Sequence, residues 1–157
     1  MKKIKWTDLL IFVIIAELVG TVSGIVSGGS FGAYYDTIAM PPFSPPGWLF
    51  PVVWTILYAL MGVSAYLIHS SDAPAKKQAL DIYWLQLLAN FLWSPAFFGI
   101  RSFGTAVAVV IVMLVLIAIM LAVFGKIRRC AVWLNIPYLV WTVFAAYLTI
   151  GAYVLNG

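Results

Sequence analysis

The stretch AVAVVIVMLVLIAIMLAVF, from Ala106 to Phe124, carries no charge and is long enough to cross a bilayer, which takes about 20 apolar residues as a helix. Because the apolar residues are continuous and do not alternate with polar ones, they predict helices rather than the strands of an outer-membrane barrel. We therefore expect an all-α membrane protein, a five transmembrane helix bundle in which residues 1–157 form a single domain. Four further apolar stretches complete the set: Trp6–Ser27, Trp48–His69, Leu80–Gly99 and Ala131–Leu155.

The composition excludes several classes of protein. Of the 157 residues, 64% are hydrophobic and 9% are charged, and the mean hydropathy is +1.06, so a soluble domain of this size could not bury its apolar surface. No nucleophile–base pair, phosphate-binding glycine loop or nucleotide motif is found, so hydrolytic and phosphoryl-transfer chemistry have no support. With one histidine, His69, and one cysteine, Cys130, we expect no metal site and no required cofactor.

The positive charges predict the orientation in the membrane. With five spans, Arg101 alone falls on one side, and eight cations fall on the other: Lys2, Lys3, Lys5, Lys76, Lys77, Lys126, Arg128 and Arg129. The positive-inside rule then places the N-terminus in the cytoplasm and the C-terminus outside. Because the cations gather at helix ends rather than on one face, we expect no nucleic-acid partner.

The first span contains small residues at every fourth position, namely Ala16, Gly20, Gly24 and Gly28. Such a stripe lets two helix backbones approach closely. It predicts either close packing inside the chain or the seam of a homodimer, and the spacing does not separate the two.

The longest connection, residues 28–47, reads GGSFGAYYDTIAMPPFSPPG. Two Pro pairs stiffen it and prevent a regular helix across them, and Asp36 is its one charged residue. This composition predicts a lid over the outer face of the bundle, with a plain connector at the membrane interface as the alternative.

Polar and aromatic residues share faces on three of the spans. Gln86, Asn90 and Trp93 lie on one face of the third span, and an amide at membrane depth is costly unless it points into the bundle. Tyr138, Trp141 and Ala145 share a face of the fifth span after Pro137, and Trp54 and Tyr58 lie one turn apart in the second. Together these faces predict a pocket with flat aromatic walls and a few hydrogen-bonding groups.

The other tryptophans and the one acid inside a span have simpler interpretations. We expect Trp6, Trp48, Trp84 and Trp133, near the ends of spans, to belong to the interfacial aromatic belts. Glu17 is expected to be protonated or hydrogen-bonded across helices, with coupling of transport to protons as the alternative.

Three segments carry a resemblance to a known family. PVVWTILYALMG (Pro51–Gly62), QLLANFLWSPAFFG (Gln86–Gly99) and IPYLVWTVFAAYL (Ile136–Leu148) resemble the signature segments of the TspO/translocator protein family, which includes tryptophan-rich sensory proteins and the peripheral benzodiazepine receptor. PPFSPPGWLF in the first loop is similar as well. Ala89 and Thr149 depart from the common pattern of these segments. No basic residue follows Tyr153, and this absence weakens the resemblance to cholesterol-binding members.

The resemblance implies a five-helix bundle, often a homodimer, that binds porphyrins in a pocket open toward the first loop. Light-dependent porphyrin breakdown, attributed to bacterial members, would make Trp54 and Trp141 the reactive residues. A porphyrin would then be ligand or substrate rather than cofactor. Together with the shared faces, the resemblance implies these ligand-binding residues: Tyr35, Trp54, Tyr58, Asn90, Trp93, Tyr138, Trp141 and Ala145.

The expected function is therefore the binding of porphyrins or similar flat apolar ligands in a multi-pass membrane protein. Two alternatives stay open. One is a carrier or exporter of porphyrin-like or sterol-like molecules, and the other is a ligand-sensing regulator that acts through partners.

Overall fold

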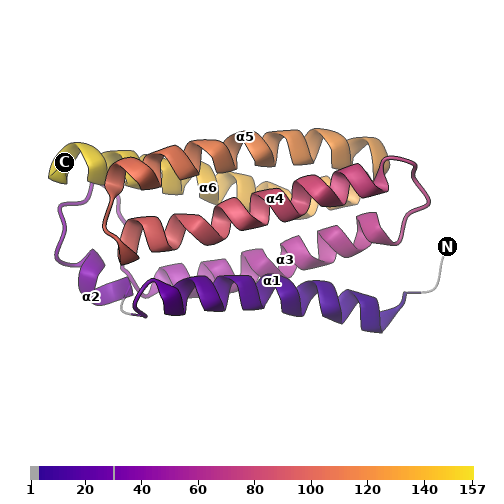
Figure 1. The fold of residues 1–157 in the computed structure, drawn as a ribbon, viewed down its shortest axis with the longest axis horizontal. Helices are drawn as coiled ribbons and strands as arrows, with labels where there is room; N and C mark the ends of the chain where they lie inside the picture. Colours follow the sequence, from indigo (N-terminus) through magenta and orange to yellow (C-terminus); the bar gives the residue numbers. More distant parts are fainter. Residues whose placement is uncertain (1–3, 30) are drawn as a thin grey trace.

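The computed structural model describes residues 4–29 and 31–157, and within these ranges the chain is helical and contains no strand (Figure 1). Five long helices run along the bundle, and a five-residue helix, α2, lies in the first connection. A π-helical turn, η1, continues α4. The elements are α1 (Trp6–Val26), α2 (Phe31–Tyr35), α3 (Leu49–His69), α4 (Lys76–Ser94), η1 (Pro95–Gly99), α5 (Phe103–Ile127) and α6 (Arg129–Asn156).

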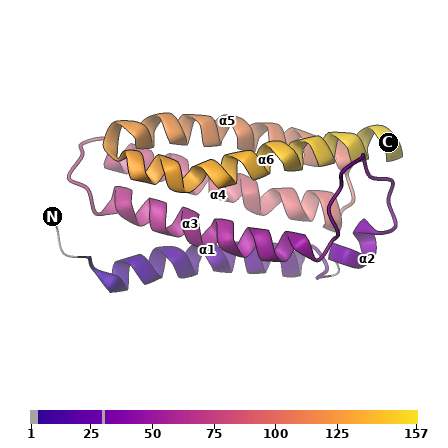
Figure 2. The same ribbon diagram turned by 180° about the vertical axis from the view of Figure 1, so that it is seen from behind.

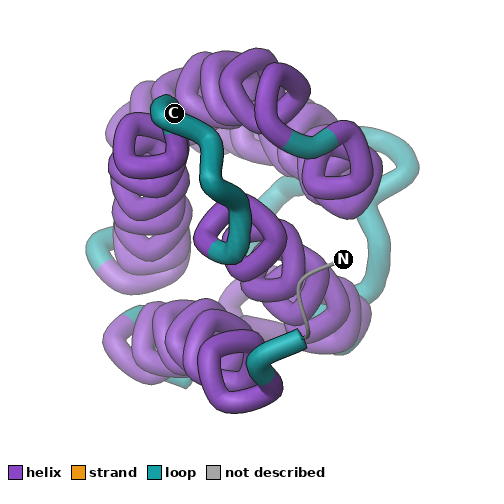
Figure 3. Tube along the Cα trace, turned by 90° about the vertical axis from the view of Figure 1, so that its right-hand side faces the viewer, coloured by secondary structure: helices purple, strands orange, loops and turns teal. Residues whose placement is uncertain are grey.

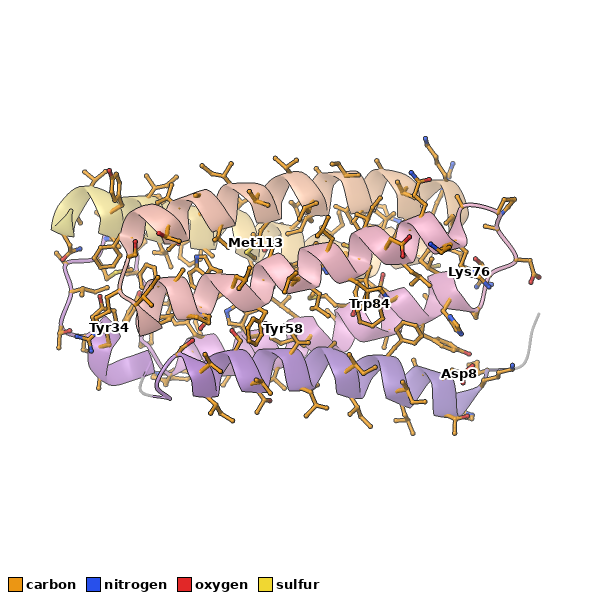
Figure 4. The ribbon with its side chains drawn as sticks, viewed as in Figure 1. Asp8, Tyr34, Tyr58, Lys76, Trp84 and Met113 are labelled. Carbon is orange, nitrogen blue, oxygen red and sulfur yellow. The ribbon has the colours of Figure 1, made fainter. Side chains whose placement is uncertain are left out.

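The five long helices neighbour one another in the cyclic order α1, α3, α6, α5, α4 (Figure 3). Four of the five seams in this ring are extensive, and the seam between α1 and α4 is the least packed. The two ends of the chain lie at opposite ends of the bundle, and α2 lies at the end that holds the C-terminus (Figure 2). Asp8 and Lys76 mark one end and Tyr34 marks the other (Figure 4).

Four helices of the described residues are long and apolar enough to cross a membrane: α1, α3, α5 and α6. The fifth long helix, α4, does not meet this criterion. Its first turns carry Lys76, Lys77 and Asp81, and its buried face carries Gln86 and Asn90. The apolar run predicts that this helix starts at Leu80, whereas α4 begins at Lys76. The difference arises because the first turn of α4 is charged and so is not part of the apolar run.

The buried core lies between the helices, while large apolar side chains cover their outer faces. On α5 the buried residues recur every three or four positions, from Val110 through Met113 and Ile117 to Phe124. Ile111 and Val115 on the opposite side are half exposed, as are Ile14 and Leu18 of α1. An exposed apolar surface of this kind suits a lipid environment, so the chain is an integral, multi-pass membrane protein.

Close approach between α1 and α3 depends on glycine. A Cβ at Gly62 of α3 would lie 2.6 Å from the Val13 Cα atom, closer than real side chains permit. Ala16 is fully buried, and a Cβ at Gly20 would collide with the Tyr58 ring. Ala16 and Gly20 of the small-residue stripe therefore pack inside the chain, whereas Gly28 at its end is exposed.

The end of α4 shows how a proline is accommodated inside the bundle. Pro95 has no backbone N–H, so the carbonyl of Phe91 one turn earlier receives no helical hydrogen bond from it. The Ser23 hydroxyl of α1 donates to this carbonyl at 2.7 Å, and the Ser27 hydroxyl donates to Ser94 Oγ at 3.1 Å. Two serines of α1 thus bridge the least packed seam of the bundle.

The first loop is attached to the end of α6. Asn156 accepts a hydrogen bond from the Ala39 N–H at 3.0 Å and donates one to its carbonyl at 2.8 Å, while the Tyr147 hydroxyl donates to the Pro42 carbonyl at 2.9 Å. The ring of Pro41 packs directly on Gly151. The described loop thus covers the outer end of α6, and α2 within it is an element that the sequence analysis missed.

Candidate ligand-binding site

A cavity of about 290 Å³ opens between α1, α3, α4 and η1. It lies along the least packed seam, where α1 faces α4. Small side chains on α1 leave the space that the cavity occupies, and aromatic side chains of α3 and α4 form its opposite wall. Its lining comprises Glu17, Gly20, Thr21, Ser23, Gly24, Ile25, Gly29, Phe50, Pro51, Trp54, Thr55, Tyr58, Asn90, Trp93, Ser94 and Phe98.

The aromatic wall is centred on Trp54. Its ring lies 5.6 Å from that of Tyr58, one turn further along α3, and 6.5 Å from that of Trp93 on α4. Phe98 of η1 extends the wall, with its ring 6.0 Å from Trp93 and nearly perpendicular to it. These contiguous rings present a broad apolar surface that suits a flat ligand.

A chain of hydrogen bonds lies behind this wall. The Tyr58 hydroxyl donates to Asn90 Oδ1 at 2.6 Å, Asn90 Nδ2 donates to the Tyr138 hydroxyl at 2.9 Å, and Tyr138 donates to Gln86 Oε1 at 2.8 Å. All four side chains are buried, which confirms that both amides of α4 point into the bundle. The chain fixes the orientation of the Asn90 amide, and of its members only Tyr58 and Asn90 line the cavity.

Trp93 is oriented by Thr149, one of the two residues that depart from the family's common pattern. Its indole N–H donates to Thr149 Oγ1 at 3.2 Å, and the Thr149 hydroxyl donates to the Ala145 carbonyl at 2.7 Å. Both side chains are buried. A threonine of α6, four residues after Ala145, can therefore hold the Trp93 ring of α4 in place.

The predicted site residues fall into two groups rather than one. Trp54, Tyr58, Asn90 and Trp93 line the cavity, and Tyr138 stands one hydrogen bond behind it. The aromatic cavity is thus bounded by α1, α3, α4 and η1, whereas the spacing predicts a pocket on the shared face of the second, third and fifth predicted spans. Residue spacing within a helix does not reveal which helices are neighbours, and this accounts for the difference.

The remaining predicted residues lie on the far side of Phe50. The Phe50 ring is 5.8 Å from that of Trp141 and 5.2 Å from that of Tyr35. Ala145 and Tyr35 line a separate cavity of only about 10 Å³. Tyr35 lies outside the spans, and burial raises the pKa of its hydroxyl above its ordinary value.

Glu17 differs from its prediction. It lies half-buried in the lining of the cavity, and among the described residues it makes no hydrogen bond or ion pair with another helix. Glycines and serines of α1 that line the cavity were also not predicted as site residues. The four-residue spacing of small side chains was the available signal, because such a stripe leaves space wherever no neighbouring residue fills it.

The tryptophans near span ends have the exposure expected of interfacial belts in three cases. Trp6, Trp48 and Trp133 are largely exposed, whereas Trp84 packs against Phe12, with ring centroids 5.8 Å apart.

Among residues 4–29 and 31–157, no group of three or more His, Cys, Asp or Glu side chains could hold a metal ion. The cavity itself offers aromatic rings for stacking, side chains that form hydrogen bonds and one carboxylate, that of Glu17.

Comparisons with known sequences identify proteins to which this chain is similar. A sequence profile described as the TspO/MBR family matches residues 12–155. The chain is 39% identical over 123 residues to the tryptophan-rich sensory protein of Cereibacter sphaeroides, covering 78% of this chain and 77% of that protein. It is 34% identical over 127 residues to the tryptophan-rich protein TspO of Chlorobaculum tepidum, covering 78% and 79%. It is 30% identical over 146 residues to the translocator protein of Bos taurus, covering 91% and 86%.

Proposed function

The chain belongs to the TspO/MBR family, and we propose that it binds porphyrins and similar flat, mostly apolar ligands in the cavity between α1, α3 and α4. The observation that carries this proposal is the contiguous wall of Trp54, Trp93 and Tyr58 facing a space left by small residues of α1. Stacking on an aromatic side chain contributes about 1–3 kcal/mol per ring, so two tryptophans supply a substantial part of the affinity for a flat ligand.

The size of the cavity sets how a porphyrin is held. Pockets that enclose drug-sized ligands measure about 300–1,000 Å³, and this cavity of about 290 Å³ is at the lower limit. A porphyrin therefore places one edge against the tryptophan wall and extends through the seam between α1 and α4. This seam is the least packed of the ring, so it opens at the lowest cost.

In the proposed topology α4 is a fifth span, the N-terminus is cytoplasmic and the C-terminus is outside. The low hydropathy of α4 comes from its charged first turns and its buried amides, while its outward face carries the half-exposed leucines Leu85, Leu88 and Leu92. Five spans also agree with termini at opposite ends of the bundle. Lys2 and Lys3 lie outside the described residues; the described cations at the starts of α1, α4 and α6 and the end of α5 share one end.

A reporter fused after Gly157 tests this topology. It is expected to be active only when placed outside the cytoplasm. Activity in the cytoplasm would contradict five spans or their orientation.

Porphyrin titration of the purified protein tests the binding site, with tryptophan quenching and porphyrin absorbance as readouts. Trp54→Ala is expected to lower the affinity on the order of tenfold, because it removes the centre of the aromatic wall. Trp133→Ala is the matched control, since Trp133 is 72% exposed and lies outside the cavity. Equal affinities of the wild type and Trp54→Ala would place the ligand elsewhere.

A carrier is the second candidate function, favoured by the unpaired carboxylate of Glu17 within the cavity. A carrier moves porphyrin into sealed liposomes, and the flux responds to a proton gradient in the wild type but not in Glu17→Gln. Binding without any flux would rule this candidate out.

Light-dependent breakdown of a bound porphyrin is a further activity to test at the same site. Of the two predicted reactive residues, Trp54 lines the cavity and Trp141 lies behind Phe50. Trp54→Phe is therefore expected to reduce breakdown more than Trp141→Phe does, because phenylalanine keeps the stacking surface but is harder to oxidise. An unchanged porphyrin spectrum after illumination of the wild type would argue against the activity.

A further inference from the structure

The cavity between α1 and α4 contains one carboxylate, that of Glu17, midway along α1. The outer end of α1, at Val26, lies nine residues away, which corresponds to about 13 Å along the helix. Tyr58 and Asn90 line the same inner part of the cavity. Glu17 thus lies at the end of the cavity that is farthest from the first loop.

Several polar groups of this lining already direct their hydrogens toward the protein. The Ser23 hydroxyl donates to the Phe91 carbonyl, the Thr55 hydroxyl to the Pro51 carbonyl, and the Tyr58 hydroxyl to Asn90. The Asn90 amide and the Trp93 indole likewise donate to side chains of α6. These five side chains of the lining therefore already donate hydrogen bonds to acceptors within the protein. The Glu17 carboxylate, by contrast, has no partner among the described residues.

The cations of the described chain do not neutralise this carboxylate. The Arg101 guanidinium lies 4.4 Å above the Tyr34 ring, and Lys77 pairs with Asp81 at 3.3 Å on the other end of the bundle. No Lys, Arg or His is found in the cavity lining. The π faces of Trp54 and Trp93 add further negative potential, which attracts cations at close range.

We infer that the cavity selects flat aromatic ligands that carry a protonated amine, with the ammonium group against Glu17 and the rings against Trp54 and Trp93. This inference rests on the proposed ligand-binding function and names the ligand class that the inner end of the cavity recognises. An ammonium group supplies the positive charge that the lining lacks, together with hydrogens that the Glu17 carboxylate can accept. A carboxylate on the ligand is repelled from this end, so the acid groups of a porphyrin lie at the mouth.

Three probes with one ring system separate charge from shape. Anthracene bearing an aminomethyl, a hydroxymethyl or a carboxylate group at the same carbon is titrated into the full chain in phosphatidylcholine nanodiscs, with quenching of tryptophan emission as the readout. Zwitterionic lipid removes any preference due to membrane charge. The wild type is expected to bind the ammonium probe about tenfold more tightly than the hydroxymethyl probe and the carboxylate probe most weakly.

Glu17→Gln is expected to remove the tenfold preference for the ammonium probe and to leave affinity for the hydroxymethyl probe unchanged. Asp8→Asn removes the same charge from the first turn of the same helix, outside this cavity, and is expected to keep the preference. The hydroxymethyl probe also reports whether each variant is folded.

Equal binding of the ammonium and hydroxymethyl probes to the wild type would overturn the inference while leaving the proposed function intact. The same holds if the preference survives in Glu17→Gln. Failure of all three probes and of porphyrin to bind the wild type would instead contradict the proposed function. The order in which the wild type binds the three probes tests the inference even if the Glu17→Gln protein does not fold.

Discussion

The two seams that α1 makes with its neighbours differ in packing although both use small residues. Against α3, Gly62 and Ala16 bring the two backbones together until no space remains for another methyl group. Against α4, the seam depends on hydrogen bonds from Ser23 and Ser27, and a cavity lies beside them. A small residue therefore gives close packing where the opposite backbone approaches and leaves a cavity where a rigid aromatic wall keeps it away.

The closely packed seam is expected to be the more sensitive to mutation. Gly62→Ala should destabilise the protein by about 3 kcal/mol, because the new methyl group collides with the backbone of α1. Thermal unfolding in detergent measures the loss. Gly125→Ala in α5 is the matched control, since its Cβ would meet only a Val132 methyl at an ordinary 3.6 Å. A similar stability of the two variants would show that the α1–α3 seam can relax.

Locking the loosely packed seam tests whether it must open for a ligand. A disulfide between Ser27→Cys and Ser94→Cys, whose hydroxyl oxygens lie 3.1 Å apart, is expected to join α1 to α4 in a Cys130→Ser background. Porphyrin affinity should then fall about tenfold and recover on reduction, because a porphyrin is larger than the closed cavity. Unchanged affinity in the oxidised form would show that the ligand enters by another route.

A double-mutant cycle tests the bridge between the same two helices. Ser23→Ala should cost about 1 kcal/mol of stability, because the Phe91 carbonyl loses its hydrogen bond. Pro95→Ala restores a backbone N–H to α4, so the same Ser23→Ala change should cost less in that background. Chemical unfolding of the four proteins measures the coupling. Additive effects would mean that Ser23 does not compensate for Pro95.

The smallest effect is expected outside both seams, where the first loop meets α6. Asn156→Ala removes two hydrogen bonds to Ala39 that are exposed at the end of the bundle. We expect a stability loss below about 1 kcal/mol and faster proteolysis of the loop, with porphyrin binding unchanged. Weaker porphyrin binding would show instead that the loop contributes to the cavity.

Much of the fold could be predicted from local patterns. The long apolar stretches correspond to helices whose ends differ from the predicted ones by a few residues, because an apolar run long enough to cross a bilayer forms a helix there. Gln86 and Asn90 were correctly predicted to point inward, since an amide in lipid has no other way to form hydrogen bonds. The charged first turn of α4 and the short helix α2 were missed because neither carries an apolar run.

The candidate site was predictable only in part. Trp54, Tyr58, Asn90 and Trp93 line one cavity, because their spacing puts them on the inner faces of two helices; their binding of a ligand stays a prediction. Trp141 and Ala145 were grouped with them although Phe50 intervenes, and Glu17 was expected to bond to another helix rather than to line a cavity. These differences depend on contacts between helices, which the spacing within one helix does not contain.

The sequence by itself determined that this chain is helical, lies in the membrane and turns the Gln86 and Asn90 amides inward, because each of these follows from the cost of polar groups in lipid. Only the tertiary structure decided that α1 rather than α6 faces the tryptophan wall and that Ser23 serves the carbonyl freed by Pro95. The physical reason is that lipid attracts every apolar helix face about equally, so the order of helices depends on the fit of side chains between neighbours.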